Sequence, residues 1–131
     1  MSSAPRAFSR TLLIDSDVEQ GRWLAEQLSH AGFETDLASG WRAADGLLRG
    51  RSYNVCIIAA ALDDPTHFEE VGRLRQRLPG VWLVALSHLQ IEKALLHAGA
   101  QGVDAVLAEP YSLRDLLSRL TALSVRSRPL F

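Results

Sequence analysis

Residues 52–65, SYNVCIIAAALDDP, are the stretch that decides the fold. The part from Asn54 to Ala60 is almost continuously apolar, and the first acids after it are Asp63 and Asp64. A short run of this kind is typical of a strand that helices cover on both faces, as in a parallel α/β sheet. Such sheets bind ligands at the carboxyl ends of their strands. This strand nevertheless ends in Ala59 and Ala60, which offer only methyl groups.

Short apolar runs and amphipathic helix patterns alternate along the rest of the chain. The other expected strands are Arg10–Ile14, Glu34–Ala38, Trp82–Leu86 and Ala105–Ala108. The expected helices are Val18–Ala31, Trp41–Arg49, Pro65–Leu78, Leu89–Ala98 and Ser112–Val125. Five β-α repeats predict a doubly wound α/β fold, with a five-stranded parallel sheet and helices on both faces. We expect one domain at 10–125, a flexible N-terminus at 1–9, and a C-terminal tail or the start of a linker at 126–131.

Composition excludes several classes of function. The 131 residues are 47% hydrophobic and 22% charged with a net charge of −1, so no strong overall field favours nucleic acid or an anionic membrane. Without a signal peptide or a long apolar run, and with a single cysteine inside a strand, we expect a cytoplasmic protein. The four histidines lack the paired spacing of metal ligands, which argues against a metal site; they are His30, His67, His88 and His97. The three tryptophans are expected to pack against core or surface neighbours; they are Trp23, Trp41 and Trp82.

Acids and hydroxyls gather where the strands are expected to end. Asp15, Ser16 and Asp17 follow the first strand, Ser87 follows the fourth, and Glu109 follows the fifth. No glycine-rich loop follows the first strand, so a dinucleotide or Walker-type phosphate site is unsupported. Oxygen ligands on one rim could still hold a hard cation.

At these positions the chain resembles the receiver domain of two-component response regulators, over residues 10 to about 125. The matching segments, in order, are LLIDSD (12–17), YNVCIIAAALDD (53–64), LPGVWLVALSH (78–88) and GVDAVLAEPY (102–111). The resemblance implies the flavodoxin-like (βα)5 fold with strand order 2-1-3-4-5. It also implies a role in bacterial signal transduction by phosphorelay and in transcription regulation.

The active positions of that family are largely replaced in this chain. The resemblance places Asp15 on the first member of the family's acidic pair and Ser16 on the second, which holds Mg²⁺ in the family. Asp17 comes one place too late and is expected to cap the following helix. The phosphoacceptor aspartate falls on Ala59, which offers no nucleophile.

Of the remaining positions, two keep the family's kind of residue and two do not. The resemblance places Ser87 on the switch hydroxyl, although without an acceptor the favoured interpretation is a hydroxyl that satisfies a backbone group at the strand end. Pro110 resembles the family's cis proline. The lysine that pairs with the phosphoryl group falls on Glu109, and the aromatic that swings inward on activation falls on Val106. A phosphoryl group beside Glu109 would meet a like charge, at a cost on the order of 1–4 kcal/mol.

We therefore expect an atypical pseudo-receiver that is not an enzyme, has no catalytic residue and uses no cofactor. Asp15 alone is a weak candidate for metal binding. The alternative is a receiver phosphorylated at a displaced acceptor, Asp63 or Asp64, in a phosphorelay. The sequence LDDP before a helix favours a cap instead, with Asp64 as the N-cap and Pro65 in the first turn.

The resemblance also indicates where a partner would bind. In the family, the fourth helix, fifth strand and fifth helix form dimers or dock effectors, and here this region carries Glu92, Lys93, Asp104, Arg114, Asp115 and Arg119. We expect a protein partner or a homodimer at this surface, against the plain alternative of a solvated face. No DNA-reading motif and no membrane segment is visible. The domain is expected to be a stand-alone adaptor or the N-terminal regulatory module of a larger flagellar- or pilus-type regulator.

Overall fold

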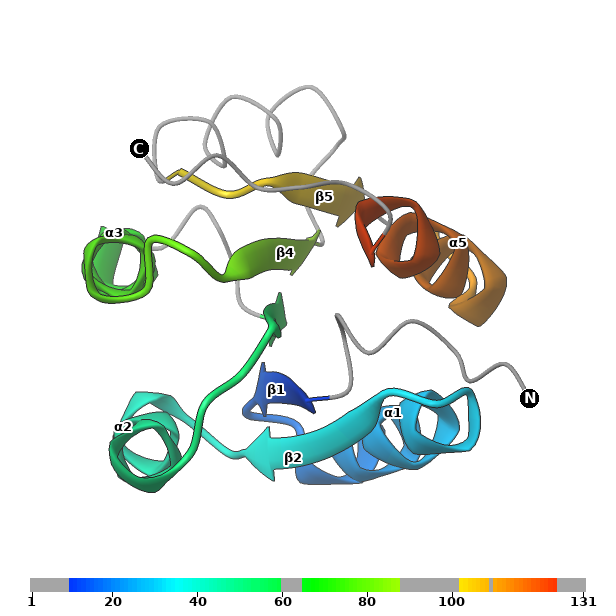
Figure 1. Ribbon diagram of the computed structural model, residues 1–131, viewed down its shortest axis with the longest axis horizontal. Coiled ribbons are helices and arrows are strands. Elements are labelled where there is room, and N and C mark those ends of the chain that lie inside the picture. Colours follow the sequence, from blue (N-terminus) through cyan, green and yellow to red (C-terminus); the bar gives the residue numbers. More distant parts are fainter. Residues whose placement is uncertain (1–9, 60–64, 88–101, 109, 125–131) are drawn as a thin grey trace.

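The computed structural model describes residues 10–59, 65–87, 102–108 and 110–124, without the side chains of 65–68 and 124. Its centre is a five-stranded, wholly parallel sheet in the order β2-β1-β3-β4-β5 (Figure 1). The strands are β1 (Arg10–Asp15), β2 (Glu34–Ala38), β3 (Val55–Ala59), β4 (Trp82–Ser87) and β5 (Ala105–Ala108). The predicted fold class and strand order are confirmed.

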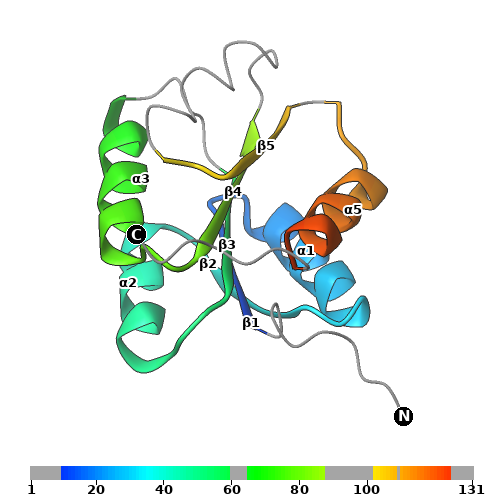
Figure 2. The same ribbon diagram turned by 45° about the horizontal axis from the view of Figure 1, so that its top comes forward.

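Helices cover both faces of the sheet. The described helices are α1 (Val18–His30), α2 (Trp41–Gly50), α3 (Pro65–Arg77) and α5 (Leu113–Ser124). Helices α1 and α5 lie on one face, and α2 and α3 lie on the other (Figure 2). The helix expected at Leu89–Ala98 falls outside the described residues. In the described part of the chain, no helix is long and apolar enough to cross a membrane.

Alternating side chains of the strands divide the core into two layers. The layer under α1 and α5 contains Leu13, Ile57, Val84, Leu86, Leu107, Leu24, Leu28, Leu116 and Leu120. The layer under α2 and α3 contains Leu12, Ile14, Cys56, Ile58, Leu83, Ala44, Val71 and Leu74. Burial raises the pKa of the Cys56 thiol to about 12, so Cys56 is a core residue with no thiolate at neutral pH.

Local signals fix the ends of the helices. The carboxylate of Asp17 accepts from the backbone N–H of Gln20 at 3.1 Å, which confirms the predicted cap of α1. Gly32 follows α1 at φ +99°, the left-handed conformation expected of a glycine stop. The Ser112 hydroxyl accepts from the backbone N–H of Asp115 at 3.1 Å, and the Asp115 carboxylate accepts from the backbone N–H of Ser112 at 2.9 Å, which forms a capping box at the start of α5. Ala31 is wrongly included in the predicted helix: it is exposed and follows the last turn.

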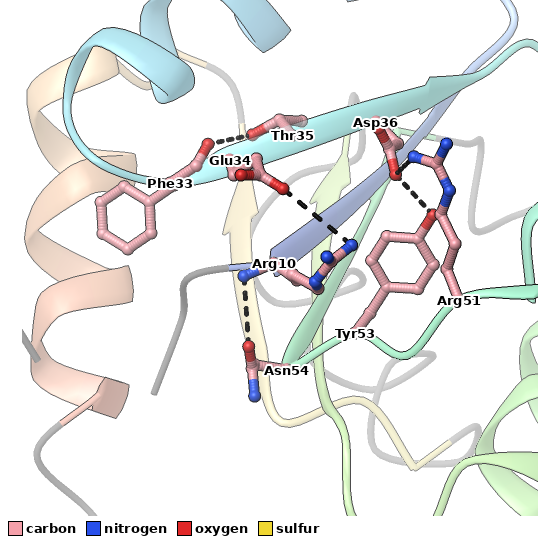
Figure 3. Close-up of polar contacts among 8 residues, drawn as sticks. All are labelled: Arg10, Phe33, Glu34, Thr35, Asp36, Arg51, Tyr53 and Asn54. Atoms are coloured by element: carbon pink, nitrogen blue, oxygen red, sulfur yellow. Dashed lines mark hydrogen bonds and ion pairs between the residues drawn. The ribbon is translucent and has the colours of Figure 1, made fainter. Parts of the chain in front are cut away.

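Polar bonds tie the amino ends of three strands together (Figure 3). The phenol of Tyr53 and the guanidinium of Arg51 both donate to Asp36 Oδ2, at 2.7 and 2.8 Å, while Arg10 N donates to Asn54 Oδ1 at 3.2 Å. Burial would raise the pKa of Asp36, but the bonds from Tyr53 and Arg51 outweigh it and lower that pKa. Burial, and then the bond to Asp36, raise the pKa of Tyr53 to about 12. This network lies at the end of the sheet away from the candidate site.

Candidate functional site

The sheet brings three of the predicted site positions together at the carboxyl ends of its strands. Asp15 is paired with Ala59, and Ala59 is paired with Leu86, one residue before Ser87. Ser87 is in turn paired with Ala108 of β5. Because parallel strands end at the same edge, Asp15, Ala59 and Ser87 line one rim, as the sequence predicted.

Asp15 is buried and serves the turn into α1. Its side chain is 4% exposed, and its Oδ1 accepts from the backbone N–H of Asp17 at 2.9 Å. A Cβ on Gly21 of α1 would lie 3.1 Å from Asp15 Cβ and 2.8 Å from Leu37 Cδ1, so the helix passes directly over this carboxylate. Ser16, the next residue, is exposed. Asp15 therefore has a structural role, which is to orient Asp17, the residue that caps α1.

The other rim positions are apolar, buried or outside the described residues. Ala59 is half-buried and packs against the core layer under α1 and α5. Ser87 is 1% exposed, and Val106 is also buried. Pro110 is exposed. The predicted positions of Glu109, Asp63 and Asp64 lie outside the described residues.

The donor set of the described rim fits a magnesium ion poorly. Mg²⁺ prefers carboxylate oxygens in octahedral geometry. Here Ser16 and Ala59 supply no carboxylate, and one oxygen of Asp15 already accepts from the chain. Among the residues that the structure describes, no three His, Cys, Asp or Glu side chains gather as a metal site would require.

Asp104, predicted on the interaction surface, is instead part of an internal clasp. Its Oδ2 accepts from Arg75 at 2.9 Å and from the backbone N–H of Leu83 at 2.8 Å. The side chains of Arg75 and Asp104 are only 16% and 15% exposed. Because this carboxylate holds α3, β4 and β5 together, we leave Asp104 out of the proposed docking surface.

Helix α5 carries the other described members of that surface. Asp115 and Arg119 line a groove of about 420 Å³ beside β5, together with Val106, Leu107, Ala108, Pro110, Tyr111, Ser118 and Ala122. Arg114 is exposed and is not among the residues that line this groove. Glu92 and Lys93 lie outside the described residues. We refer to this feature as the β5–α5 groove.

A second groove, which the sequence did not reveal, lies between α1 and α5. Its volume is about 660 Å³, and its lining residues are Gln20, Trp23, Leu24, Pro110, Tyr111, Leu113 and Leu116. Trp23 was expected to pack against neighbours, yet 55% of its surface remains exposed. The available signal was its place one residue before the buried Leu24, about 100° off the apolar stripe of α1. We refer to this feature as the α1–α5 groove.

The fold defines a class of protein architecture: a doubly wound (βα)5 domain with the fold of response-regulator receiver domains. Comparison with known proteins supports that class, although no family model matches the chain. The transcriptional regulatory protein TctD of Salmonella typhimurium is 34% identical over 121 residues, which are 90% of this chain and 53% of TctD. CusR of Escherichia coli, also a transcriptional regulatory protein, is 25% identical over 114 residues, 87% of this chain and 50% of CusR. This chain thus spans about half the length of such relatives.

Solved structures agree with the sequence relatives. An orphan response regulator of H. pylori, HP1043, is 25% identical with a TM-score of 0.75, and the match covers 93% of this chain and 100% of that one. A two-component response regulator from Clostridium difficile has a TM-score of 0.78 at 21% identity, and the match covers 90% and 97% of the two chains. The latter similarity supports the fold.

Proposed function

We propose that this chain is a pseudo-receiver that acts by protein–protein contact, independently of phosphorylation. The observation that carries the proposal is Ala59. Its register beside Asp15 and Leu86 places it at the end of the central strand, where a methyl group packs against the core. A methyl group cannot attack phosphorus, so the position on which the family's chemistry depends has none.

The neighbouring residues support the same proposal. Phosphoryl transfer needs a carboxylate nucleophile, a cation and positive charge on the transferred oxygens. Ser16 replaces a metal-binding acid with an exposed hydroxyl, and the bond from Asp17 occupies one oxygen of Asp15. The sequence also places the acid Glu109 where the resemblance expects a lysine.

The proposed docking surface is the β5–α5 groove; Glu92 and Lys93, which the sequence also assigned to the interaction surface, lie outside the described residues. The groove has apolar walls from Val106 and Leu107, and Asp115 and Arg119 offer an acceptor and a planar donor. A protein partner with an apolar ridge flanked by charges of both signs fits this chemistry. The relatives are transcriptional regulatory proteins, so we place the domain as the regulatory module of such a protein.

Intact mass after incubation with acetyl phosphate and Mg²⁺ tests phosphorylation independence. We expect no added HPO₃ group on the native chain. A stoichiometric adduct would contradict the proposal, and peptide mapping to Asp63 or Asp64 would establish the displaced acceptor instead. A typical receiver treated in parallel shows that the phosphodonor is active.

Restoring the acceptor alone should also fail. Ala59→Asp leaves Ser16 and Glu109 in place, so the cation stays weakly held and the phosphoryl group still lacks a positive partner. We expect efficient modification only when Ser16→Asp and Glu109→Lys are added. Equal labelling of the single and triple variants would show that these two positions do not limit the reaction.

A further inference from the structure

The walls of the α1–α5 groove are aromatic and apolar, and none of the described residues that line it is charged. Trp23 of α1 and Tyr111, which precedes α5, supply the two aromatic rings. Leu24 and Leu116 are 4% and 0% exposed and form the floor, whereas Trp23 is 55% exposed. An exposed aromatic side chain beside an apolar hollow indicates a binding site rather than a solvated face.

Two other grooves of the described structure differ from this one in charge. The β5–α5 groove contains Asp115 and Arg119. A groove of about 330 Å³ between α2 and α3 contains two acids and two arginines, namely Asp45, Glu70, Arg73 and Arg77. Charged lining residues can pair with charges on a partner, whereas an uncharged lining offers an ion nothing in exchange for the water that it loses. The ligand of the α1–α5 groove should therefore be uncharged.

The size of the groove and its polar group define the ligand further. The volume of about 660 Å³ lies within the roughly 300–1,000 Å³ of small-molecule sites. Planar aromatic molecules stack favourably on the rings of tryptophan and tyrosine. The lining residue Gln20 stands three positions before Trp23 on α1, so the two side chains are neighbours on the helix surface. Its amide can both donate and accept, and can thus bond one hydroxyl, carbonyl or ring nitrogen.

We propose that the α1–α5 groove binds an uncharged, planar aromatic small molecule with one hydrogen-bonding group at its edge. The rings of this molecule stack on Trp23 and contact Tyr111, and its edge bonds to the amide of Gln20. Figure 2 shows α1 and α5 side by side on one face of the sheet, so the bound molecule joins the two helices. Because it binds the folded chain alone, it should also raise the melting temperature.

The two grooves beside α5 share part of their walls. Pro110 and Tyr111 line both the α1–α5 groove and the β5–α5 groove. A molecule in the first groove therefore contacts a segment that also lines the proposed docking surface, and its binding should change the affinity for a partner. This regulatory role rests on the proposed function, but the binding itself uses neither Asp15 nor Ala59. A phosphate adduct would thus overturn the proposed function and leave the binding test below unaffected.

Heteronuclear NMR of the whole chain, with three matched probes, tests the binding. The indole N–H of each of the three tryptophans gives its own signal, and Trp23→Phe identifies that of Trp23. The probes are 2-naphthol, which is neutral and planar, its saturated counterpart 2-decalol, and the anion 2-naphthoate. We expect 2-naphthol to shift the Trp23 signal in a saturable manner below millimolar concentration, and the other two probes to bind tenfold or more weakly.

Variants of α1 connect the binding to the groove. Trp23→Ala should weaken the binding of 2-naphthol tenfold or more. Val18→Ala is the matched control, since Val18 is 43% exposed on the same helix but does not line the groove. Gln20→Leu should weaken the binding of 2-naphthol but not of naphthalene, which has no hydroxyl. Unchanged far-ultraviolet circular dichroism confirms that each variant is folded.

Three results would each overturn the inference. The first is the absence of a saturable shift with 2-naphthol, which would leave the groove to a protein partner. The second is equal affinity for 2-naphthol and 2-decalol, which would mean that the hollow does not select planar rings. The third is an affinity for 2-naphthol that neither Trp23→Ala nor Gln20→Leu lowers, which would place the binding elsewhere on the chain.

Discussion

Arg75→Met should be among the most destabilising single changes to a polar side chain of the described structure. Arg75, on α3, donates through one terminal nitrogen to Asp104 Oδ2 at 2.9 Å and to the carbonyl of Gly102 at 3.2 Å. The other terminal nitrogen donates to the carbonyls of Leu78 and Val81 at 2.6 and 2.7 Å. One guanidinium thus joins the end of α3, the approach to β4 and the segment before β5.

The size of the loss follows from what the substitution leaves behind. Methionine keeps most of the apolar stem but removes a donor from the mostly buried carboxylate of Asp104 and from three carbonyl groups, although Asp104 still accepts from Leu83 N–H and the Leu78 carbonyl from Val81 N–H. Removing one partner of a buried ion pair costs about 3–5 kcal/mol, and an exposed pair is worth at most about 1 kcal/mol. Because Arg75 and Asp104 keep 16% and 15% exposure, water partly compensates. We expect a loss of about 2–4 kcal/mol in the free energy of unfolding.

Urea unfolding at neutral pH measures this loss, with Arg73→Met as the matched control. Arg73 lies on the same helix and pairs with Glu69 and Glu70, but its side chain is 68% exposed, so its removal should cost less than about 1 kcal/mol. A loss for Arg75→Met no greater than for Arg73→Met would refute the reasoning. If Arg75→Met does not fold, Asp104→Asn gives the same comparison, since Leu83 N–H keeps an acceptor. If Arg75→Met does fold, the two single variants and the double variant yield the coupling energy of the pair.

Three further expectations concern packing, pH and cation binding. Gly21→Ala should lower the free energy of unfolding by about 1 kcal/mol, because the added Cβ would crowd Asp15 and Leu37. Gly46→Ala has open space around it and should raise the free energy of unfolding by up to about 1 kcal/mol. Denaturant midpoints that move in the same direction for both variants would contradict this reasoning. The pKa of Tyr53 is raised to about 12, so the stability that its protonated phenol contributes is complete below the unfolded-state pKa near ~10 and is lost as pH rises through 12. Tyr53→Phe should therefore lose less stability than the native chain over that alkaline interval, which denaturant titrations at a series of pH values will measure. Millimolar Mg²⁺ should hardly move the melting temperature relative to sodium chloride of equal ionic strength, since a ligand at its Kd adds only roughly 0.4 kcal/mol; a rise of several degrees would reveal a built cation site.

The sequence predicted most of the fold because its local and global signals agree. All five strands appear within one residue of their expected starts, since continuous apolar runs such as Val55–Ile58 have no other stable environment. The cap at Asp17 and the capping box of Ser112 and Asp115 were predictable because their bonds join residues only three apart. The exception at Ala31 follows from Gly32, which takes the left-handed conformation directly after the last turn.

The site was less predictable, because its contacts join residues far apart along the chain. Asp104 is an ordinary charged residue before a strand in the sequence, and its partner Arg75 lies 29 residues earlier. Nothing local distinguishes it from Arg119, which lines the β5–α5 groove. Trp23 was missed for a related reason, since the hollow beside it is completed by α5, about ninety residues further on.

Asp15 shows why the retained residues of the rim argue for a scaffold rather than for chemistry. Its carboxylate orients Asp17, whose own carboxylate caps α1, and Gly21 lets that helix pass close above it. Replacing Asp15 would therefore disturb the start of α1, whether or not a cation ever binds there. A methyl group at Ala59 disturbs no such contact and joins the core layer instead. The contact of Asp15 with the start of α1 gives this acid a structural role of its own, so the presence of one acid at this rim is weak evidence for phosphoryl transfer. By the same reasoning, helix α1 remains well supported as one wall of the α1–α5 groove whether or not the domain carries an acceptor.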